Sequence, residues 1–152
     1  MKLKTILMMS VVALCSSACS DDEKVPTVAD IAGNYQGYTL AGCAYFQNIC
    51  ADAETVTIAE NADGTARVTF VSDSWGEFTI PVATMSENGG TYALTGSGQT
   101  KMGMGGNVSS YDCTYTAVIR SKESARMQFK VAGVMGGLTI DFNTGEAPAV
   151  AE

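Results

Sequence analysis

Histidine is absent from this chain of 152 residues. The chain therefore lacks the side chain that most often acts as a general base and as a neutral metal ligand. Basic residues are also few, with nine lysines and arginines against sixteen aspartates and glutamates, and they form no cluster. Such a chain repels a polyanion and has few cations with which to release counterions. We therefore expect no nucleic acid partner, no enzyme activity, no metal ion and no cofactor.

The sequence also lacks an apolar run long enough to span a bilayer. Its most apolar stretch, residues 6–14, is far shorter than the roughly twenty residues that a membrane helix needs. Lys2 and Lys4 precede this stretch, and small residues follow it up to Cys19. A charged start, a short apolar segment and small residues are typical of a cleaved secretory signal. We expect residues 1–18 to be removed on export, which leaves seven basic and sixteen acidic residues and a net charge of −9.

The residues at the expected cleavage site, Ser16-Ser17-Ala18-Cys19, resemble a bacterial lipobox, in which the cysteine becomes the lipidated first residue. The acidic run behind it, residues 20–23, resembles the surface-export tag of Bacteroidota-type lipoproteins. A lipobox more often has an aliphatic residue in place of Ser16, and an ordinary signal peptidase could also cut before Cys19. The resemblance implies a protein anchored in the outer membrane through lipid on Cys19 and exposed at the cell surface, with residues 19–30 as lipidated start and linker.

Cysteine is too scarce in the exported chain to form more than one internal disulfide. Besides Cys19, that chain has Cys43, Cys50 and Cys113. Cys43 and Cys50 lie close together in one expected loop, and a bridge between them would contribute about 2 to 3 kcal/mol in the loop-closure model. We predict this pair, with Cys113 as a buried thiol. Pairing of Cys113 with either of the others, or no bridge at all, are the alternatives.

Helical periodicity is missing after the signal, and an alternation with a period of two takes its place. Val56 and Ile58 share one face, Val68 and Phe70 share another, and the polar residues 61–64 form a turn between them. Strands are expected at 33–40, 54–60 and 65–71, around Phe78 and Ile80, around Tyr92 and Leu94, and at 113–119, 127–131 and 138–142.

Eight short strands joined mainly by hairpins favour an all-β fold over residues 31–144, an up-and-down antiparallel β-barrel. Closure removes the unpaired edges that an open sheet would leave. A β-sandwich is the alternative. The last residues, 145–152, are expected to form a flexible tail.

Five elements of the sequence resemble a known family when they are taken in order. They are residues 31–37 at the opening strand, the turn 61–64, residues 87–92, the Met-Gly-rich stretch 102–106, and residues 134–140. Together they resemble the calycin-like, or lipocalin-like, small β-barrel domains of Bacteroidota-type lipoproteins, over residues 30–143. The resemblance implies a barrel with a small-ligand cavity, and it implies no particular ligand.

The parity of the connections separates the two ends of such a barrel. The connections after the even strands are tight polar turns, at 61–64, 86–90 and 121–124. Those after the odd strands, at 41–53, 73–75, 96–107 and 132–136, emerge together at the other end and carry aromatic side chains and methionines. These side chains are Tyr45, Phe46, Trp75, Met102, Met104 and Met135. Aromatics and methionines adapt to irregular apolar or sugar surfaces, so we predict that a small apolar or glycan-like ligand binds there.

Two alternatives stay open for these six side chains. They could fold inward and fill the barrel, because an eight-stranded barrel is narrow enough for side chains to occupy it. The same rim could instead dock a partner protein, so that the domain works as an accessory subunit, an adhesin or an inhibitor. In each case the lipid anchor is the expected contact with the membrane.

Overall fold

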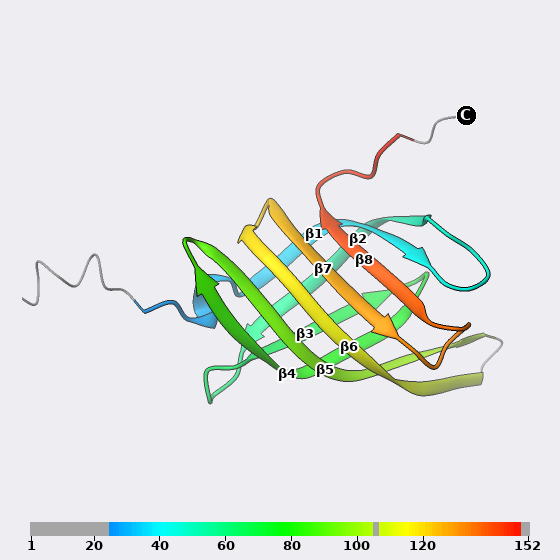
Figure 1. Ribbon diagram of the computed structural model, residues 1–152, viewed down its shortest axis with the longest axis horizontal. Helices are drawn as coiled ribbons and strands as arrows, with labels where there is room; N and C mark the ends of the chain where they lie inside the picture. Colours follow the sequence, from blue (N-terminus) through cyan, green and yellow to red (C-terminus); the bar gives the residue numbers. More distant parts are fainter. Residues whose placement is uncertain (1–24, 105–106, 150–152) are drawn as a thin grey trace, which may run out of the picture.

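The computed structural model describes residues 25–104 and 107–149. Its eight antiparallel strands follow one another around a closed barrel, in which β1 also pairs with β8 (Figure 1). The 3₁₀ helix η1 spans Val28–Asp30, and the strands are β1 Gly33–Gly42, β2 Ile49–Glu60, β3 Ala66–Ser72, β4 Gly76–Asn88, β5 Thr91–Met104, β6 Asn107–Ser121, β7 Ser124–Val131 and β8 Leu138–Thr144. The predicted up-and-down barrel is confirmed, and the sandwich alternative is wrong. The predicted signal at 1–18 and Cys19 lie outside the described residues.

The strands form because apolar and polar residues alternate along them, and β6 shows this most clearly. Cys113, Tyr115, Ala117 and Ile119 are buried, whereas the residues between them are exposed. Successive side chains of a strand point to opposite faces, so this alternation turns one apolar face of each strand toward the barrel axis. The burial patterns of β3 and β7 alternate in the same way.

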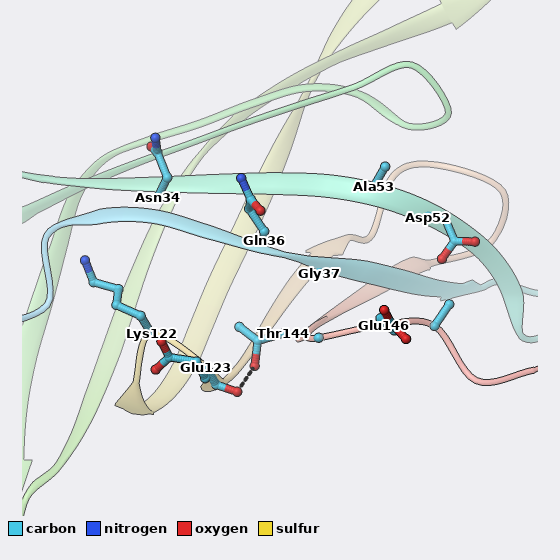
Figure 2. A pocket seen from close by; sticks show the side chains of 11 residues that line it. Asn34, Gln36, Gly37, Asp52, Ala53, Lys122, Glu123, Thr144 and Glu146 are labelled. Carbon is cyan, nitrogen blue, oxygen red and sulfur yellow. Dashed lines mark hydrogen bonds between the residues drawn. The ribbon is translucent and has the colours of Figure 1, made fainter.

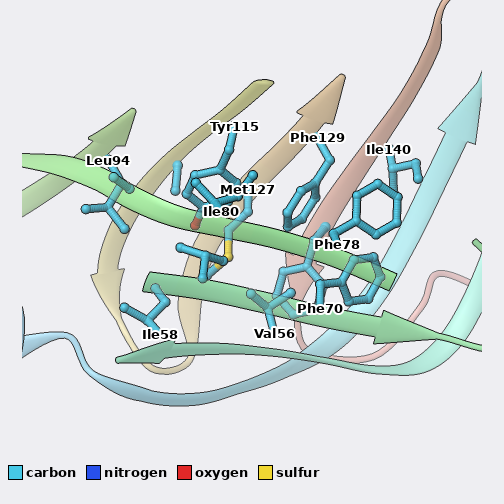
Figure 3. Close-up of a cluster of buried hydrophobic side chains, with 14 of the residues drawn as sticks. Val56, Ile58, Phe70, Phe78, Ile80, Leu94, Tyr115, Met127, Phe129 and Ile140 are labelled. Carbon is cyan, nitrogen blue, oxygen red and sulfur yellow. The ribbon is translucent and has the colours of Figure 1, made fainter. Parts of the chain in front are cut away.

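Aromatic rings fill the middle of the barrel, as Figure 3 shows. The ring of Phe129 lies 5.0 Å from that of Tyr115, 5.1 Å from that of Phe78 and 5.3 Å from that of Phe70, measured between centroids. All four side chains are at most 1% exposed. The middle of the barrel is thus occupied by strand residues at inward positions. A ligand pocket inside the barrel therefore has to lie above the aromatic core.

The segment before β1 closes the turn end of the barrel. Val28 of η1 and Ile31 are buried there. The Tyr35 hydroxyl donates a hydrogen bond of 2.6 Å to the Ile31 carbonyl, and the Lys122 ammonium group lies 5.2 Å from the centroid of the Tyr35 ring. Lys122 also donates to the carbonyl of Ala32. The chain therefore enters the barrel at the end of the tight polar turns.

The predicted loops at 41–53 and 96–107 were too long. Strand β5 runs to Met104 and pairs along its whole length with β6, which begins at Asn107. Likewise β1 ends at Gly42 and β2 begins at Ile49, which leaves only residues 43–48 as their connection. At the turn end, β4 extends to Asn88, three residues into the turn expected at 86–90. Long hairpins, rather than long loops, thus form the end opposite η1, on the right of Figure 1.

Two glycines of β5, Gly96 and Gly98, lie where β4 comes very close to β5. A Cβ atom on Gly98 would be 2.0 Å from the carbonyl oxygen of Thr79, and one on Gly96 would be 2.6 Å from that of Val82. The register of β4 shifts between Thr79 and Val82, and Pro81 lies in this bulge, where a strand tolerates proline. Glycine is needed here for close backbone approach at a bend in the barrel wall.

The predicted disulfide between Cys43 and Cys50 is absent, because all three cysteines of the described chain are free thiols. Cys50 is exposed, and it pairs in register with Leu40 of β1. Cys43 follows β1 and is only 5% exposed, and its sulfur accepts a hydrogen bond from the backbone N–H of Tyr45. One thiol therefore faces the interior and the other faces solvent. The expectation that Cys113 is a buried thiol agrees with the structure.

Thiol labelling is expected to separate these cysteines. In the folded protein, an aromatic disulfide reagent should label Cys50 rapidly, whereas Cys43 and Cys113 should react only after unfolding. Burial also raises the pKa of Cys113 to about 11, which keeps this sulfur a poorly nucleophilic thiol at neutral pH. The Cys50→Ser variant should lose the rapid phase alone. If the rapid phase is missing in the unaltered protein and returns after reduction, Cys43 and Cys50 form a bridge after all.

Candidate functional site: a pocket at the barrel mouth

A pocket of about 450 Å³ opens at the end of the barrel formed by the connections after the odd strands. We call it the mouth pocket. Its floor includes the buried residues Ser72 and Leu138, so it lies directly on the core. Its lining consists of Phe46, residues 72–76, Met102, Gly103, Tyr111, Val134, Met135 and Leu138.

Four of the six side chains predicted to bind a ligand line the mouth pocket. Phe46 comes from the β1–β2 connection, Trp75 from the β3–β4 turn, Met102 from β5 and Met135 from the β7–β8 turn. Tyr45 does not line it and points to solvent, with 79% of its surface exposed. Met104 ends β5, and its side chain lies outside the described part of the structure. Whether the assembled residues bind a ligand stays a prediction.

Ser72 fixes the turn that places Trp75 in the pocket. Its hydroxyl oxygen accepts hydrogen bonds from the backbone N–H groups of Ser74 and Trp75, both at 3.1 Å. A serine at the end of a strand that binds the next backbone amides in this way holds a tight turn. The indole ring of Trp75 is further oriented by its own N–H group, which donates to the hydroxyl of Thr39 at 2.9 Å.

A buried carboxyl group, that of Glu54, lies beneath this turn. It accepts hydrogen bonds at one oxygen from the hydroxyls of Ser72, at 2.7 Å, and Thr39, at 3.4 Å. Burial raises the pKa of Glu54, and the negative charge of Asp73 adds to this rise, whereas the two hydrogen bonds oppose it. Because Ser72 and Thr39 also bind Trp75, the carboxyl group supports the aromatic wall of the pocket from below.

Three connections that are distant in sequence are tied together at the rim. The rings of Phe46 and Trp75 are stacked, with centroids 6.4 Å apart and planes inclined by 21°. The backbone N–H of Ala44 donates to the carbonyl of Met135 at 3.2 Å, which joins the β1–β2 connection to the β7–β8 turn. Met135 adopts a positive φ of 48°, a conformation that is uncommon for a side-chain-bearing residue and is found at functional sites.

Sequence reasoning missed several residues of the mouth pocket. Tyr111 lies in β6, opposite Thr100 of β5, within a stretch whose pairing could not be known before the long hairpin was seen. The inward position of Glu54, which lies beneath the pocket lining, could have been predicted from the sequence. Glu54 shares the parity of Val56 and Ile58, so the alternation already placed a carboxyl group on the inward face of β2.

Figure 2 shows a second and larger hollow, of about 740 Å³, on the outer side of β1 and β2. Its lining includes Asn34, Gln36 and Asp52, together with Lys122, Glu123, Thr144 and Glu146, and it has no aromatic ring. Some of its polar groups bind the protein's own backbone, as in the hydrogen bond of 2.9 Å from the Thr144 hydroxyl to the Glu123 carbonyl. Small-molecule sites are mostly apolar with a few placed polar groups, so the mouth pocket fits this description better.

The described residues offer neither a cluster of metal ligands nor a helix that could span a membrane. They contain no group of three or more cysteines, aspartates or glutamates placed to hold a metal ion. Within the same residues, no helix has the length and apolar character needed to cross a membrane.

Comparison with known proteins gives one informative neighbour. A scan against models of known protein families finds no match, and neither does a search of the curated proteins. Among solved structures, the chain is similar to a "putative outer membrane protein" from Bacteroides fragilis NCTC 9343, with 32% sequence identity and a TM-score of 0.65. The similarity covers 80% of this chain and 46% of that protein. The chain therefore spans less than half of its neighbour, and the calycin-like family is not confirmed by it.

Proposed function

We propose that this protein is a non-enzymatic, lipid-anchored protein of the outer membrane and cell surface, related to the calycin-like barrels, which binds a small apolar or glycan-like ligand in its mouth pocket. The observation that carries the proposal is the pocket itself. Three aromatic side chains, those of Phe46, Trp75 and Tyr111, line it together with two methionines. The similarity to the Bacteroides fragilis protein supports the location.

The distribution of polar residues supports a tether rather than a membrane-spanning barrel. Thr114 and Thr116 of β6, and Arg126 and Lys130 of β7, face outward and are exposed. A barrel wall in contact with lipid carries an apolar band on its outside, which is the opposite arrangement. Lipid on Cys19 would then hold the domain at the membrane.

The position of the chain start supports an outward-facing pocket. The described chain begins next to η1, at the turn end of the barrel (Figure 1). The connections that line the mouth pocket lie at the other end. An anchor that joins the domain at the turn end would direct the pocket away from the membrane surface. A ligand from the medium could then enter without passing the bilayer.

A second candidate function is the docking of a partner protein at the same end. Tyr45 is 79% exposed, Val108 is 62% exposed and Met135 is 42% exposed, and all three lie in or near the connections after the odd strands. Exposed apolar side chains that gather on one end of a domain are typical of an interaction site. The filled aromatic core also suits a domain that works through its surface.

Native mass spectrometry tests the first proposal. The purified protein, exposed to an extract of the source cells and their medium, should acquire a reproducible small-molecule adduct, and the Met102→Ala variant should retain about tenfold less of it, since the lost contacts amount to more than 1 kcal/mol. Met85→Ala is the matched control, because Met85 is also partly buried against the core but does not line the pocket.

Two results would contradict the pocket as the binding site. One is an adduct that survives Met102→Ala and Phe46→Ala unchanged. The other is a bare mass in every extract, which would favour the docking function. Turnover of a substrate by the purified protein would overturn the non-enzymatic proposal.

A further inference from the structure

We infer that the mouth pocket accepts a small organic cation, an ammonium or quaternary ammonium group that carries short alkyl substituents. The inference rests on the proposed function and names the chemical class of its ligand. Three features of the pocket carry it, namely its aromatic rings, the sign of its charge and the use already made of the N–H donors in its β3–β4 turn.

The aromatic rings provide the first argument. Phe46 and Trp75 both line the mouth pocket, and their rings are stacked within 21° of parallel. Tyr111, from the β5–β6 hairpin, adds a third partly buried ring. The face of an aromatic ring is electronegative and attracts a cation that lies within about 6 Å of its centroid. A cluster of such rings is a recurrent binding site for quaternary ammonium groups.

The charge of the pocket provides the second argument. Asp73 is the one charged residue of its lining, and no lysine or arginine is among the residues that line it. A second carboxyl group, that of Glu54, lies one hydrogen bond of 2.7 Å behind Ser72. The pocket thus offers one negative charge, on the exposed side chain of Asp73, beside aromatic rings.

The N–H donors of the β3–β4 turn provide the third argument, which separates a cation from an anion. The indole N–H of Trp75 is already donated to Thr39, and the backbone N–H groups of Ser74 and Trp75 are donated to Ser72. The Ser72 hydroxyl in turn donates its own hydrogen bond to the Glu54 carboxyl group. The hydroxyls of Ser74 and Tyr111 also line the pocket, and each can accept as well as donate a hydrogen bond. An anion needs donors or positive charge. An alkylated ammonium group needs neither, because it is bound by ring faces and a carboxylate.

Trp75 makes this testable, because it is the only tryptophan of the chain and its fluorescence reports on the pocket directly. The experiment titrates the protein with choline and with its uncharged isostere, in which a tert-butyl group replaces the trimethylammonium group. We expect choline to change the Trp75 emission in a saturable manner and the isostere to bind about tenfold more weakly, as the size of cation–π and carboxylate contributions implies.

Isosteric removal of one carboxylate tests the role of charge, and a second such removal away from the pocket is the matched control. Asp73→Asn should weaken choline binding by about two- to fivefold, since Asp73 is exposed, and leave the binding of the isostere unchanged. Glu60→Gln, which removes the same charge from an exposed position at the turn end, should change neither. Phosphatidylcholine vesicles, titrated in parallel, show whether the cation is recognised free or as a lipid headgroup, and binding of either form supports the inference.

Three results would overturn the inference and still leave the proposed function to be judged separately. If the isostere binds as tightly as choline, the pocket binds apolar ligands without regard to charge. If Glu60→Gln weakens choline as much as Asp73→Asn, the effect comes from net charge and not from the pocket. If neither compound changes the emission, the organic-cation class is wrong, and the extract experiment alone decides whether the pocket binds another ligand.

Discussion

Replacement of Gly98 by alanine is expected to lower the free energy of unfolding by about 3 kcal/mol or more, a large effect for a single methyl group. The added Cβ atom would lie 2.0 Å from the carbonyl oxygen of Thr79 and 2.8 Å from the Cα atom of Ile80. Both are backbone atoms, so no rotamer change can relieve the clash. The β4 strand would have to move away from β5 at the bend that closes the barrel, and the measurement is equilibrium unfolding in urea.

Gly133→Ala is the matched control for this experiment. A Cβ atom there would meet only the ring of Tyr111, at 3.7 Å, which is ordinary van der Waals contact. Its stability should be unchanged or higher by up to about 1 kcal/mol, because alanine restricts the unfolded chain. If Gly98→Ala proved as stable as Gly133→Ala, then β4 and β5 would not approach each other as closely as described.

The same glycines show where prediction from sequence reached its limit. Alternation of apolar residues identified all eight strands, because in a barrel with a filled interior one face of every strand must be apolar. The glycines at 96, 98, 103, 105 and 106 suggested a loop instead, since glycine usually marks a turn. In β5, however, Gly98 is a strand residue that allows a neighbouring backbone to come close. Composition alone cannot distinguish these two uses of glycine.

The sequence predicted those features of the candidate site that follow from the topology of the barrel. In an up-and-down barrel, parity alone brings the connections after the odd strands to one end, and the structure accordingly assembles Phe46, Trp75, Met102 and Met135 around one pocket. Which side chain of a connection turns inward depends on local turns that parity does not describe. Cys43 donates its N–H to the Phe46 carbonyl in a tight turn, and Tyr45, in the middle of that turn, is left in solvent.

The disulfide prediction failed for a related reason. Nearness in sequence is sufficient for pairing only if the two residues lie in a loop that can bring the sulfurs together. Here β2 begins at Ile49 and carries Cys50 into the sheet, whereas Cys43 remains in the connection and packs inward. Strand pairing therefore places the two thiols on different sides of the hairpin.

Replacement of Phe129 by alanine is expected to have the largest effect among substitutions in the core, a loss of about 3 to 5 kcal/mol in the free energy of unfolding. Phe129 contacts Phe70, Phe78 and Tyr115, with centroid distances from 5.0 to 5.3 Å. Its removal leaves a cavity at the centre of the barrel, which the surrounding strands cannot close because their hydrogen bonds fix their spacing. Urea or thermal unfolding monitored by far-ultraviolet circular dichroism measures this loss.

Tyr115→Phe tests the same aromatic cluster with the opposite expected sign. The Tyr115 hydroxyl is buried, and within the described residues it has no hydrogen-bond partner. Burial of such a group without a partner costs about 1 to 3 kcal/mol, so its removal should leave stability unchanged or raise it by about 1 kcal/mol, while the ring contact with Phe129 is kept. A marked loss of stability in Tyr115→Phe would mean that a water molecule binds this hydroxyl inside the barrel. A loss below about 1 kcal/mol in Phe129→Ala would mean that the centre is loosely packed.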